Sequence, residues 1–178
     1  MNTLCLHDKK FEICIPSPDV QKAVDAIALR MNQELCDKNP LFISILNGSF
    51  MFTSDLMKRL NFNCELSFIK LSSYKGLNSS GEIKELVGLN ENLANRMVVI
   101  LEDIIDTGTT IAKTVEKLRS FHPSEIRIAT LFLKPEIFKG NITLDYVGIE
   151  VPNKFIVGCG LDYNGLGRNY PDLYALVP

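Results

Sequence analysis

The stretch from residue 98 to residue 110 places the strongest constraint on how this chain can fold. An apolar run over residues 98–101 ends in the acid pair Glu102 and Asp103, and a third acid, Asp106, precedes a cluster of Thr and Gly. A buried strand that delivers carboxylates to its end, next to a helix N-terminus, is the arrangement by which α/β proteins hold phosphorylated sugars or nucleotides. Because carboxylates alone repel phosphate, the pattern predicts a ligand that also brings hydroxyl groups or a metal ion.

Size and composition limit the class of protein to which this chain can belong. The chain has 178 residues, 46% hydrophobic and 22% charged, which is typical of one soluble globular domain with a full core. A formal net charge of −2 offers no basic field for nucleic acid. No apolar run approaches the roughly 20 residues that span a bilayer. The polar first ten residues lack the apolar core of a signal peptide. We therefore expect a cytoplasmic protein that binds neither nucleic acid nor membrane.

The cysteines and histidines narrow the chemistry further. The cysteines are an odd, scattered set without a close pair, namely Cys5, Cys14, Cys36, Cys64 and Cys159. Such spacing argues against a disulfide framework or a zinc knuckle, so we interpret them as reduced thiols. His7 and His122 are the only histidines, so a catalytic site centred on histidine has few candidate residues.

Hydrophobic spacing predicts strands and helices that alternate along the chain. Ser17 as a cap, followed by Pro18 and Asp19, predicts the start of a helix that Pro40 stops. Further strands and helices follow in alternation: strands at 41–46, 64–71, 97–101 and 126–133, and helices at 50–60 and 109–121. This alternation predicts a parallel sheet with helices on both faces. After Pro135 the pieces become shorter, at 144–149 and 155–158, and we expect the tail from Asp162 to fold back as a small subdomain over the sheet edge.

Residues 72–90 differ from the rest of the chain. They are rich in Ser, Gly, Lys and Glu, and the segment is too long for an ordinary connection in a compact domain. It is either a surface hairpin or disordered loop, or a mobile lid over a binding site. The sequence favours neither alternative.

The segment from Asp106 to Thr110 has the chemistry of a phosphate cradle. Gly108 lets the backbone approach a ligand closely, and successive N–H groups with hydroxyls can surround a phosphate. The alternative makes Asp106 a helix N-cap and nothing more. That alternative leaves Glu102 and Asp103 unexplained, because buried carboxylates are costly unless they meet hydrogen bonds, cations or ligand hydroxyls.

These residues resemble a known family. Residues 101–108, LEDIIDTG, resemble the phosphoribosyl pyrophosphate motif of the type I phosphoribosyltransferases, in its hypoxanthine-guanine form. Further segments resemble other parts of the same family, from about Ser17 onward: 45–52 its pyrophosphate turn, 71–74 its Ser-Tyr lid, 151–158 its purine pocket, and 160–164 with Arg168 its closing segment. The resemblance implies one domain over 1–178, a Rossmann-like parallel sheet flanked by helices, and a small hood formed from the N-terminal segment and roughly 135–178.

The resemblance also implies an activity. Members of the family transfer the 5-phosphoribosyl group of phosphoribosyl pyrophosphate to a purine nitrogen and release pyrophosphate. For the hypoxanthine-guanine branch this means IMP or GMP in purine salvage, with Mg²⁺ as cofactor and a homodimer or homotetramer as assembly. Two alternatives stay open: a transferase for another base, such as xanthine, adenine or uracil, and an RNA-binding regulator of the pyrimidine-operon type on the same fold. The net charge of −2 speaks against the second.

The resemblance assigns roles to individual residues. Asp106 is the implied general base or acid. The implied ligands of phosphoribosyl pyrophosphate are Asn47, Gly48, Glu102, Asp103, Thr107, Gly108, Thr109, Thr110 and Arg168. The implied purine-binding residues are Lys134, Phe155, Ile156 and Asp162, the lid residues are Ser73 and Tyr74, and the Mg²⁺ ligands are Glu102, Asp103 and Asp162.

Each of these roles has a simpler alternative. Phe155 taken alone reads as a core aromatic, and Lys134, just before Pro135, as a solvated lysine. Asp162 and Arg168 read as an ordinary solvated pair on a surface turn. The chain also departs from the family in two places: Asn47 stands where many relatives carry lysine, and residues 165–167, GLG, are smaller than usual before Arg168.

Overall fold

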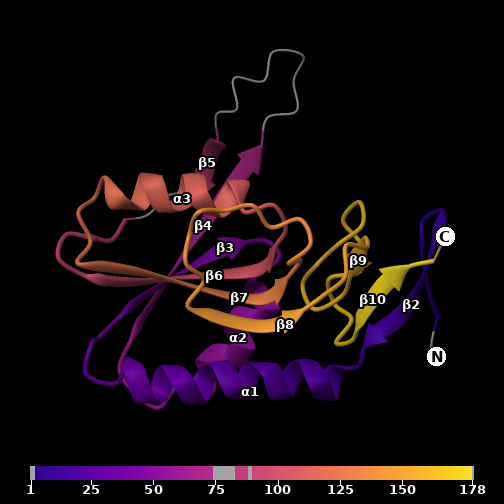
Figure 1. Ribbon diagram of the computed structural model, residues 1–178, viewed down its shortest axis with the longest axis horizontal. Coiled ribbons are helices and arrows are strands. Elements are labelled where there is room, and N and C mark those ends of the chain that lie inside the picture. The colour runs from indigo at the N-terminus through magenta and orange to yellow at the C-terminus, as the bar shows by residue number, and fades with distance from the viewer. Residues whose placement is uncertain (1–2, 74–82, 88–89, 178) are drawn as a thin grey trace.

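The computed structural model describes residues 3–73, 83–87 and 90–177, with the backbone alone for 71–73 and 83–87. Its centre is a six-stranded sheet in the order β5-β4-β3-β6-β7-β8 (Figure 1). These strands are β3 (Leu41–Leu46), β4 (Glu65–Ser73), β5 (Ile83–Val87), β6 (Met97–Ile105), β7 (Glu125–Leu133) and β8 (Tyr146–Glu150). Five of them run parallel, and β5 is an antiparallel edge strand. The predicted parallel sheet is confirmed.

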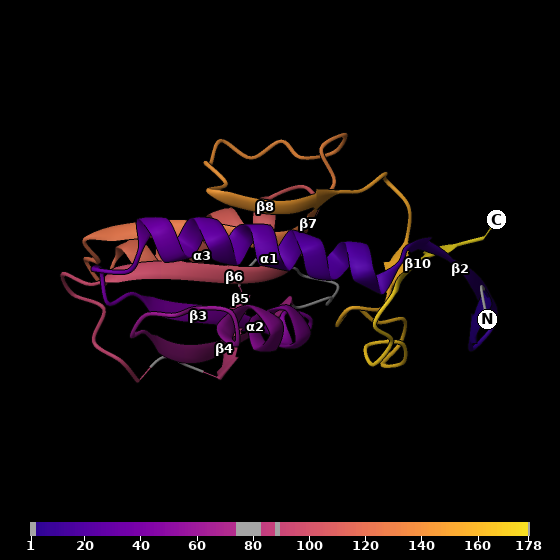
Figure 2. The ribbon, with the colours of Figure 1, turned by 90° about the horizontal axis from the view of Figure 1, so that it is seen from below.

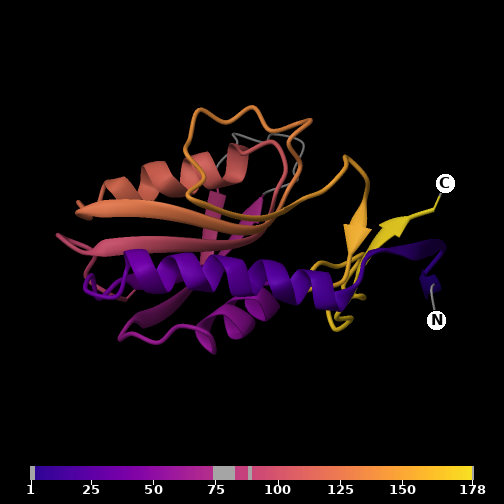
Figure 3. The same cartoon turned by 60° about the horizontal axis from the view of Figure 1, so that its bottom comes forward.

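Three helices cover the two faces of this sheet: α1 (Ser17–Glu34), α2 (Phe50–Met57) and α3 (Thr109–Arg119). Figure 3 shows α3 on one face and α1 with α2 on the other. Each face buries its own apolar core, because side chains alternate across a strand. Val24, Met31 and Leu56 pack against one face, whereas Ile111 and Leu118 pack against the other. The predicted helices on both faces are confirmed.

A second, antiparallel sheet lies at one end of the molecule, in the order β1-β2-β10-β9. Its strands come from both ends of the chain: β1 (Thr3–Leu6), β2 (Lys9–Ile15), β9 (Ile156–Val157) and β10 (Leu173–Leu176). Figure 2 shows this small sheet beyond the start of α1, together with both chain ends. Phe11, Val157 and Tyr174 are buried in its own small core. The sequence analysis did not predict β1 and β2.

The start of α1 is held by the small sheet and not by its own first residue. Ser17 was expected to be the N-cap, but Pro16 takes that position and Ser17 is already helical. The Ser17 N–H donates to Asp172 Oδ1 at 2.6 Å, across 155 residues of sequence. A carboxylate that is distant in sequence therefore accepts a hydrogen bond from the first turn of α1, as the side chain of the N-cap residue does in many helices.

Strand β6 is longer than its run of apolar residues predicted. It was expected to end at Leu101, but it continues to Ile105. Its pairing with β3 stops where Ser44 meets Leu101, and β7 alone carries it from there to the Ile105–Leu133 pair. Glu102 and Asp103 thus lie inside a strand, just beyond the point where its pairing with β3 stops.

The segment 72–90 begins and ends as paired strands. Backbone pairing of β4 with β5 joins Ser73 to Ile83 in antiparallel fashion, so the ends form a hairpin. Tyr74 lies outside the described residues, as do 75–82 and 88–89. A lid role for Ser73 and Tyr74 stays a prediction.

All five cysteines are free, as predicted. No helix in the described part of the chain is both long and apolar enough to cross a membrane.

Candidate active site

The candidate site lies at the point of the central sheet where the order in which the chain adds strands reverses. Strands β4 and β3 lie on one side of this point, and β6, β7 and β8 follow on the other. In open α/β sheets, ligands bind outside the carboxyl ends of the strands at such a switch point. Here the turn Asn47–Gly48 follows β3, the acids end β6, and Lys134 follows β7.

The two acids of β6 are partly buried, without full compensation of their carboxylates. Burial, together with the neighbouring Asp103, raises the pKa of Glu102 well above its usual value. Its Oε2 atom is buried and has no hydrogen-bond partner among the described residues. Burial likewise raises the pKa of Asp103 to about 6, although its Oδ1 accepts the Ile104 N–H at 2.8 Å. A cation or ligand hydroxyls at this place would relieve both carboxylates.

Gly48 lets the turn after β3 close onto Asp103. A Cβ at position 48 would lie 1.4 Å from Asp103 Oδ2, so a larger residue would have to displace that carboxylate. A chain of buried hydroxyls fixes the turn from below: Ser44 Oγ lies 2.7 Å from both Ser49 Oγ and Thr53 Oγ1. Asn47 itself is exposed. Sequence reasoning missed these hydroxyls, and the signal for them was a serine at position 44 inside an apolar strand.

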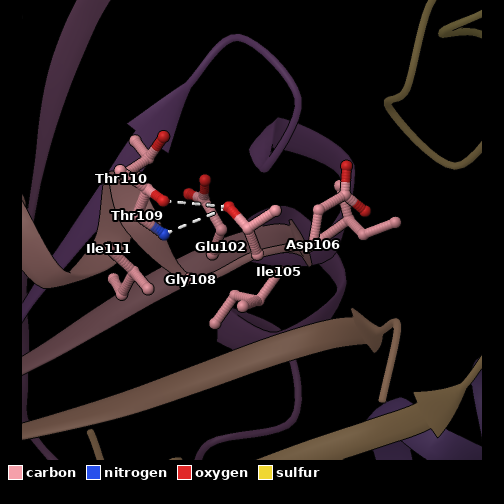
Figure 4. Close-up of a pocket in the computed structure, with 9 residues that line it drawn as sticks. Glu102, Ile105, Asp106, Gly108, Thr109, Thr110 and Ile111 are labelled. Atoms are coloured by element: carbon pink, nitrogen blue, oxygen red, sulfur yellow. Dashed lines mark hydrogen bonds between the residues drawn. The ribbon is translucent and has the colours of Figure 1, made fainter. Parts of the chain in front are cut away.

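A pocket lies between the end of β6 and the start of α3, as Figure 4 shows. Thr109 and Thr110 line it on one side and Asp106 on the other, with Glu102 between them. The first backbone N–H groups of α3 lie at this pocket, and the partial positive charge of a helix N-terminus favours an anion there. The pocket thus joins an anion site to a carboxylate.

The loop that leads into α3 is shaped by a glycine. Gly108 is the N-cap residue of α3 and has a φ of 84°, which favours glycine. The alternative that Asp106 serves only as the helix cap is therefore wrong. The Thr107 hydroxyl lies 3.0 Å from that of Thr109 and accepts the Thr109 N–H at 3.4 Å (Figure 4). Hydroxyl and N–H groups are thus grouped at one spot, as a phosphate cradle requires.

Asp106 and Lys134 form an ion pair at the ends of neighbouring strands. Lys134 Nζ lies 3.0 Å from Asp106 Oδ1. The backbone brings them together, because the Lys134 N–H donates to the Ile105 carbonyl at 3.0 Å. The lysine side chain is 10% exposed and the aspartate side chain 49%. Lys134 is therefore not the solvated lysine of the alternative, and the carboxylate beside it stays accessible to a ligand.

The closing segment packs onto the turn after β3. A Cβ on Gly160 would lie 2.0 Å from the Gly48 carbonyl oxygen, so the two backbones are in direct contact. Arg168 Nη2 lies 2.5 Å from Asp162 Oδ1, and Arg168 Nη1 donates to the Gly160 carbonyl at 2.7 Å. Asp162 Oδ2 accepts the Gly165 N–H at 2.7 Å. Asp162 and Arg168 thus form an ion pair next to the other site residues, and with side chains 27% and 28% exposed it is not the solvated pair of the alternative.

The positive charge of Arg168 acts on Asp103, where it lowers the pKa and so opposes the larger effect of burial. Asp162 does not join Glu102 and Asp103 in a ready metal cluster: in the described part of the chain, no three acidic, His or Cys side chains are grouped to hold an ion. A cation held by Glu102 and Asp103 would need further ligands from water or from another bound molecule.

Phe155 is not a core aromatic. Its residue is 48% exposed, whereas the next residue, Ile156, is buried in β9. The Phe155 ring contacts the Tyr163 ring edge to face, with centroids 5.7 Å apart. An exposed ring that is supported from one side is suited to stack on a flat ligand.

The comparisons with known proteins agree with this geometry. A family model described as "Phosphoribosyl transferase domain" matches residues 16–164. The chain belongs to the phosphoribosyltransferase family. The hypoxanthine-guanine phosphoribosyltransferase of Bacillus subtilis (strain 168) is 38% identical to this phosphoribosyltransferase over 173 residues, which is 97% of this chain and 96% of that protein.

Solved structures extend the same likeness. A crystal structure of hypoxanthine phosphoribosyltransferase from Staphylococcus aureus has a TM-score of 0.88 and 36% identity, covering 94% of this chain and 91% of that one. The hypoxanthine phosphoribosyltransferase of Trypanosoma cruzi, in complex with the product IMP, has a TM-score of 0.88 and 30% identity, covering 98% of both chains. The resemblance to the hypoxanthine-guanine branch is thereby confirmed.

We predict that replacing Glu102 by Gln makes this ligand-free phosphoribosyltransferase more stable at pH 7.5, by about 1–2 kcal/mol, because an uncompensated buried carboxylate is removed. Since burial raises the pKa of Glu102, the folded chain holds this proton more tightly than the unfolded chain. The stability of the native sequence therefore falls as pH rises above the ordinary value near 4.5, and the gain from Glu102→Gln should grow from pH 5 to pH 8.

Urea unfolding at pH 5, 6.5 and 8 measures this difference, with Glu116→Gln on the exposed face of α3 as the control. The two variants differ in burial but carry the same chemical change. An unchanged or lower stability of Glu102→Gln at pH 7.5 contradicts the prediction, and so does a gain that is equal at all three pH values.

Proposed function

We propose that this protein transfers the 5-phosphoribosyl group of phosphoribosyl pyrophosphate to a 6-oxopurine, giving IMP from hypoxanthine or GMP from guanine, and releases pyrophosphate. The observation that carries the proposal is the grouping of three things at one switch point. These are a buried acid pair, an anion cradle, and the 3.0 Å ion pair of Lys134 and Asp106. The names of the relatives support it, because they are hypoxanthine-guanine phosphoribosyltransferases.

The cradle would hold the 5′-phosphate of the sugar. Backbone N–H groups at the start of α3 point into it, and the hydroxyls of residues 107, 109 and 110 surround it. On the other side of the switch point, the backbone at Gly48 would approach the pyrophosphate closely, with Asn47 beside it. Arg168 would add positive charge there. Such positioning matters because bond breaking at the ribose anomeric carbon builds positive charge on the sugar and negative charge on the pyrophosphate.

Glu102 and Asp103 would bind the ribose hydroxyls directly or through Mg²⁺. The residues present fit a cation, because one buried Glu102 oxygen has no partner among the described residues and both carboxylates have raised pKa values. Hard oxygen ligands of this kind suit Mg²⁺, which needs only one or two protein carboxylates when a substrate phosphate supplies the rest. When bound, the ion would neutralise charge on the departing pyrophosphate. Asp162 would contribute to the ion or to the base from the closing segment.

The base would lie between Phe155 and the end of β7. Lys134 would donate to the 6-oxo group, while Asp106 would accept or return a proton at an imidazole nitrogen of the purine. The C1′ bond to the pyrophosphate oxygen breaks and a C1′ bond to the purine nitrogen forms. Stacking on Phe155 is worth about 1–3 kcal/mol by analogy with base–aromatic stacking elsewhere. Ile156 would line the same pocket from β9.

The small sheet and the segment after β4 would cover the site. The chain between β9 and β10 contacts the turn after β3 through Gly160, which suits a hood of the N-terminal segment and roughly 135–178. The hairpin of β4 and β5, with Ser73 and Tyr74, would close over the sugar and exclude water during transfer. We further propose a cytoplasmic enzyme that works as a homodimer or homotetramer.

One assay tests the proposal. Purified protein with phosphoribosyl pyrophosphate and Mg²⁺ should turn over hypoxanthine or guanine at least tenfold more efficiently than adenine or uracil, because a lysine donor selects a 6-oxo group. Formation of IMP or GMP is followed by absorbance and chromatography. Turnover of uracil or adenine alone would replace the proposed substrate class. Tight RNA binding without any base turnover would favour the regulator alternative.

Asp106→Asn should lower kcat by about 10²–10⁴ while KM for both substrates changes little, because the amide keeps the shape but cannot take the proton. Steady-state kinetics with hypoxanthine measures both constants. Asp37→Asn, at an exposed position on the opposite end of the sheet, serves as the control. Near-normal kcat in Asp106→Asn would remove this residue from catalysis.

Lys134→Met should lower kcat/KM for hypoxanthine by about 10–100-fold, the worth of one hydrogen bond from a charged donor. Turnover of adenine should fall much less, so that the preference for 6-oxopurines shrinks. Methionine keeps the buried apolar stem, which limits the effect on folding. Lys38→Met, at an exposed position before β3, is the matched control. An unchanged ranking of the bases would place Lys134 outside the purine pocket.

A further inference from the structure

The tip of the N-terminal hairpin lies against the closing segment, residues 160–168. The hairpin consists of β1 and β2, with His7 and Asp8 at its turn. The family model begins at residue 16, so this hairpin lies outside the matched part. Nevertheless, several contacts connect it to residues next to those proposed to bind the purine.

Two polar contacts fix the tip of the hairpin to the closing segment. The Tyr163 hydroxyl donates to Asp8 Oδ1 at 2.8 Å, and His7 Nε2 lies 3.3 Å from the Asn164 carbonyl oxygen. The His7 and Tyr163 rings also meet edge to face, 5.6 Å between centroids. The bond from Tyr163 is the main cause that lowers the pKa of Asp8, so this carboxylate is ionised at neutral pH. A charged acceptor makes such a hydrogen bond stronger than one between neutral groups.

An aromatic cluster continues from this contact to Phe155. The Tyr163 ring lies 5.7 Å from the Phe155 ring, with planes at 81°, and 6.0 Å from the Phe11 ring. Phe11, on β2, is fully buried and also contacts Phe155, with centroids 6.3 Å apart. Phe155 therefore rests on one ring from the hairpin and one from the closing segment, while about half of it stays exposed.

The closing segment touches the hairpin at a further point. A Cβ on Gly167 would lie 2.9 Å from Leu6 Cδ1, so the backbone next to Arg168 lies directly on β1. Tyr163 itself follows Asp162, whose carboxylate holds Arg168 and the Gly165 N–H. The position of the hairpin thus constrains both ends of a segment that carries Asp162 and Arg168.

We propose that Tyr163 and Asp8 are positioning residues of the purine site: their contact holds the closing segment against the N-terminal hairpin so that Phe155 and Asp162 are arranged for the base before it binds. This inference rests on the proposed function for the identity of the ligand. Neither residue touches the base in the proposal. Holding the ring in advance reduces the ordering cost at binding, which strengthens binding of the base without adding a contact to it.

A double-mutant cycle tests the proposal through the kinetics of the full-length enzyme with hypoxanthine and phosphoribosyl pyrophosphate. Tyr163→Phe keeps the ring and removes only the hydroxyl, and Asp8→Ala removes the acceptor together with the exposed ion pair to Lys9, in which Nζ lies 3.4 Å from Asp8 Oδ2. Each single variant should raise KM for hypoxanthine about three- to tenfold, in line with the loss of one hydrogen bond, while kcat and KM for phosphoribosyl pyrophosphate stay within about twofold. The double variant should be no worse than either single variant, because both remove the same contact.

Two further variants separate positioning from general stability. Asp8→Asn keeps an acceptor oxygen and should restore most of the affinity for hypoxanthine. Glu65→Ala removes a carboxylate of similar exposure, 52% against 66% for Asp8, that pairs with Arg96 at the opposite end of the sheet, and should leave KM unchanged. An unchanged KM in Tyr163→Phe, or additive effects in the double variant, overturns the proposal. So does a fall in thermal stability with an equal rise in KM for both substrates.

Hydrogen exchange of the ligand-free protein gives a readout that does not depend on the reaction. Tyr163→Phe should speed exchange of the amide protons of residues 160–168 at least threefold, relative to those of α3 in the same sample. If the native sequence turns over no purine base, the proposed function fails while this measurement still decides whether the contact holds the segment. Unchanged exchange shows that Tyr163 and Asp8 do not hold it.

Discussion

The site depends on one feature of the sheet: strand β6 continues for four residues after β3 has stopped pairing with it. Beyond Leu101, β7 alone pairs with β6, and the turn at Gly48 lies against Asp103. Both carboxylates are partly buried, one Glu102 oxygen has no hydrogen-bond partner among the described residues, and the pKa of each acid is raised. Burial of this kind is unfavourable, so apolar packing on both faces of the sheet must offset it. A cation or ligand hydroxyls bound at these carboxylates would relieve the same cost, as the proposed function requires.

The other parts of the site are arranged around this gap. Because β6 and β7 stay paired to their last residues, the side chains just beyond them, Asp106 and Lys134, meet at 3.0 Å. The chain between β9 and β10 contacts the rest of the molecule at two separate places. Gly160 lies on the backbone of Gly48, and Asp172 accepts the first N–H of α1. A segment distant in sequence is thereby connected to both the site and the longest helix.

The motif at residues 98–110 and the strand–helix alternation were enough to predict the parallel sheet, because both are local patterns of hydrophobic spacing. Ser17 failed as a cap because a carboxylate 155 residues away takes that role, and no local pattern reports such a contact. The predicted end of β6, Leu101, is four residues too early, because Glu102 and Asp103 were interpreted as lying beyond the strand. Pairing with β7 in fact continues past both acids. The hairpin of β1 and β2 was not predicted, because the first ten residues were interpreted as a polar segment. The alternation of exposed and buried side chains that buries Leu4 and Leu6 was not recognised there.

The departure at Asn47 shows how these parts depend on one another. At position 47, where the family resemblance implies that lysine is common, this chain has an exposed amide, so in the proposed function residue 47 would bring no charge to the pyrophosphate. Arg168 is a cation in the closing segment whose charge already reaches Asp103. Its guanidinium is held by Asp162 and the Gly160 carbonyl, and Gly160 rests on Gly48 next to residue 47. In the proposed function, positive charge near the pyrophosphate therefore comes from a segment whose position depends on the small sheet, and the residues before position 16 affect a site that they do not enter.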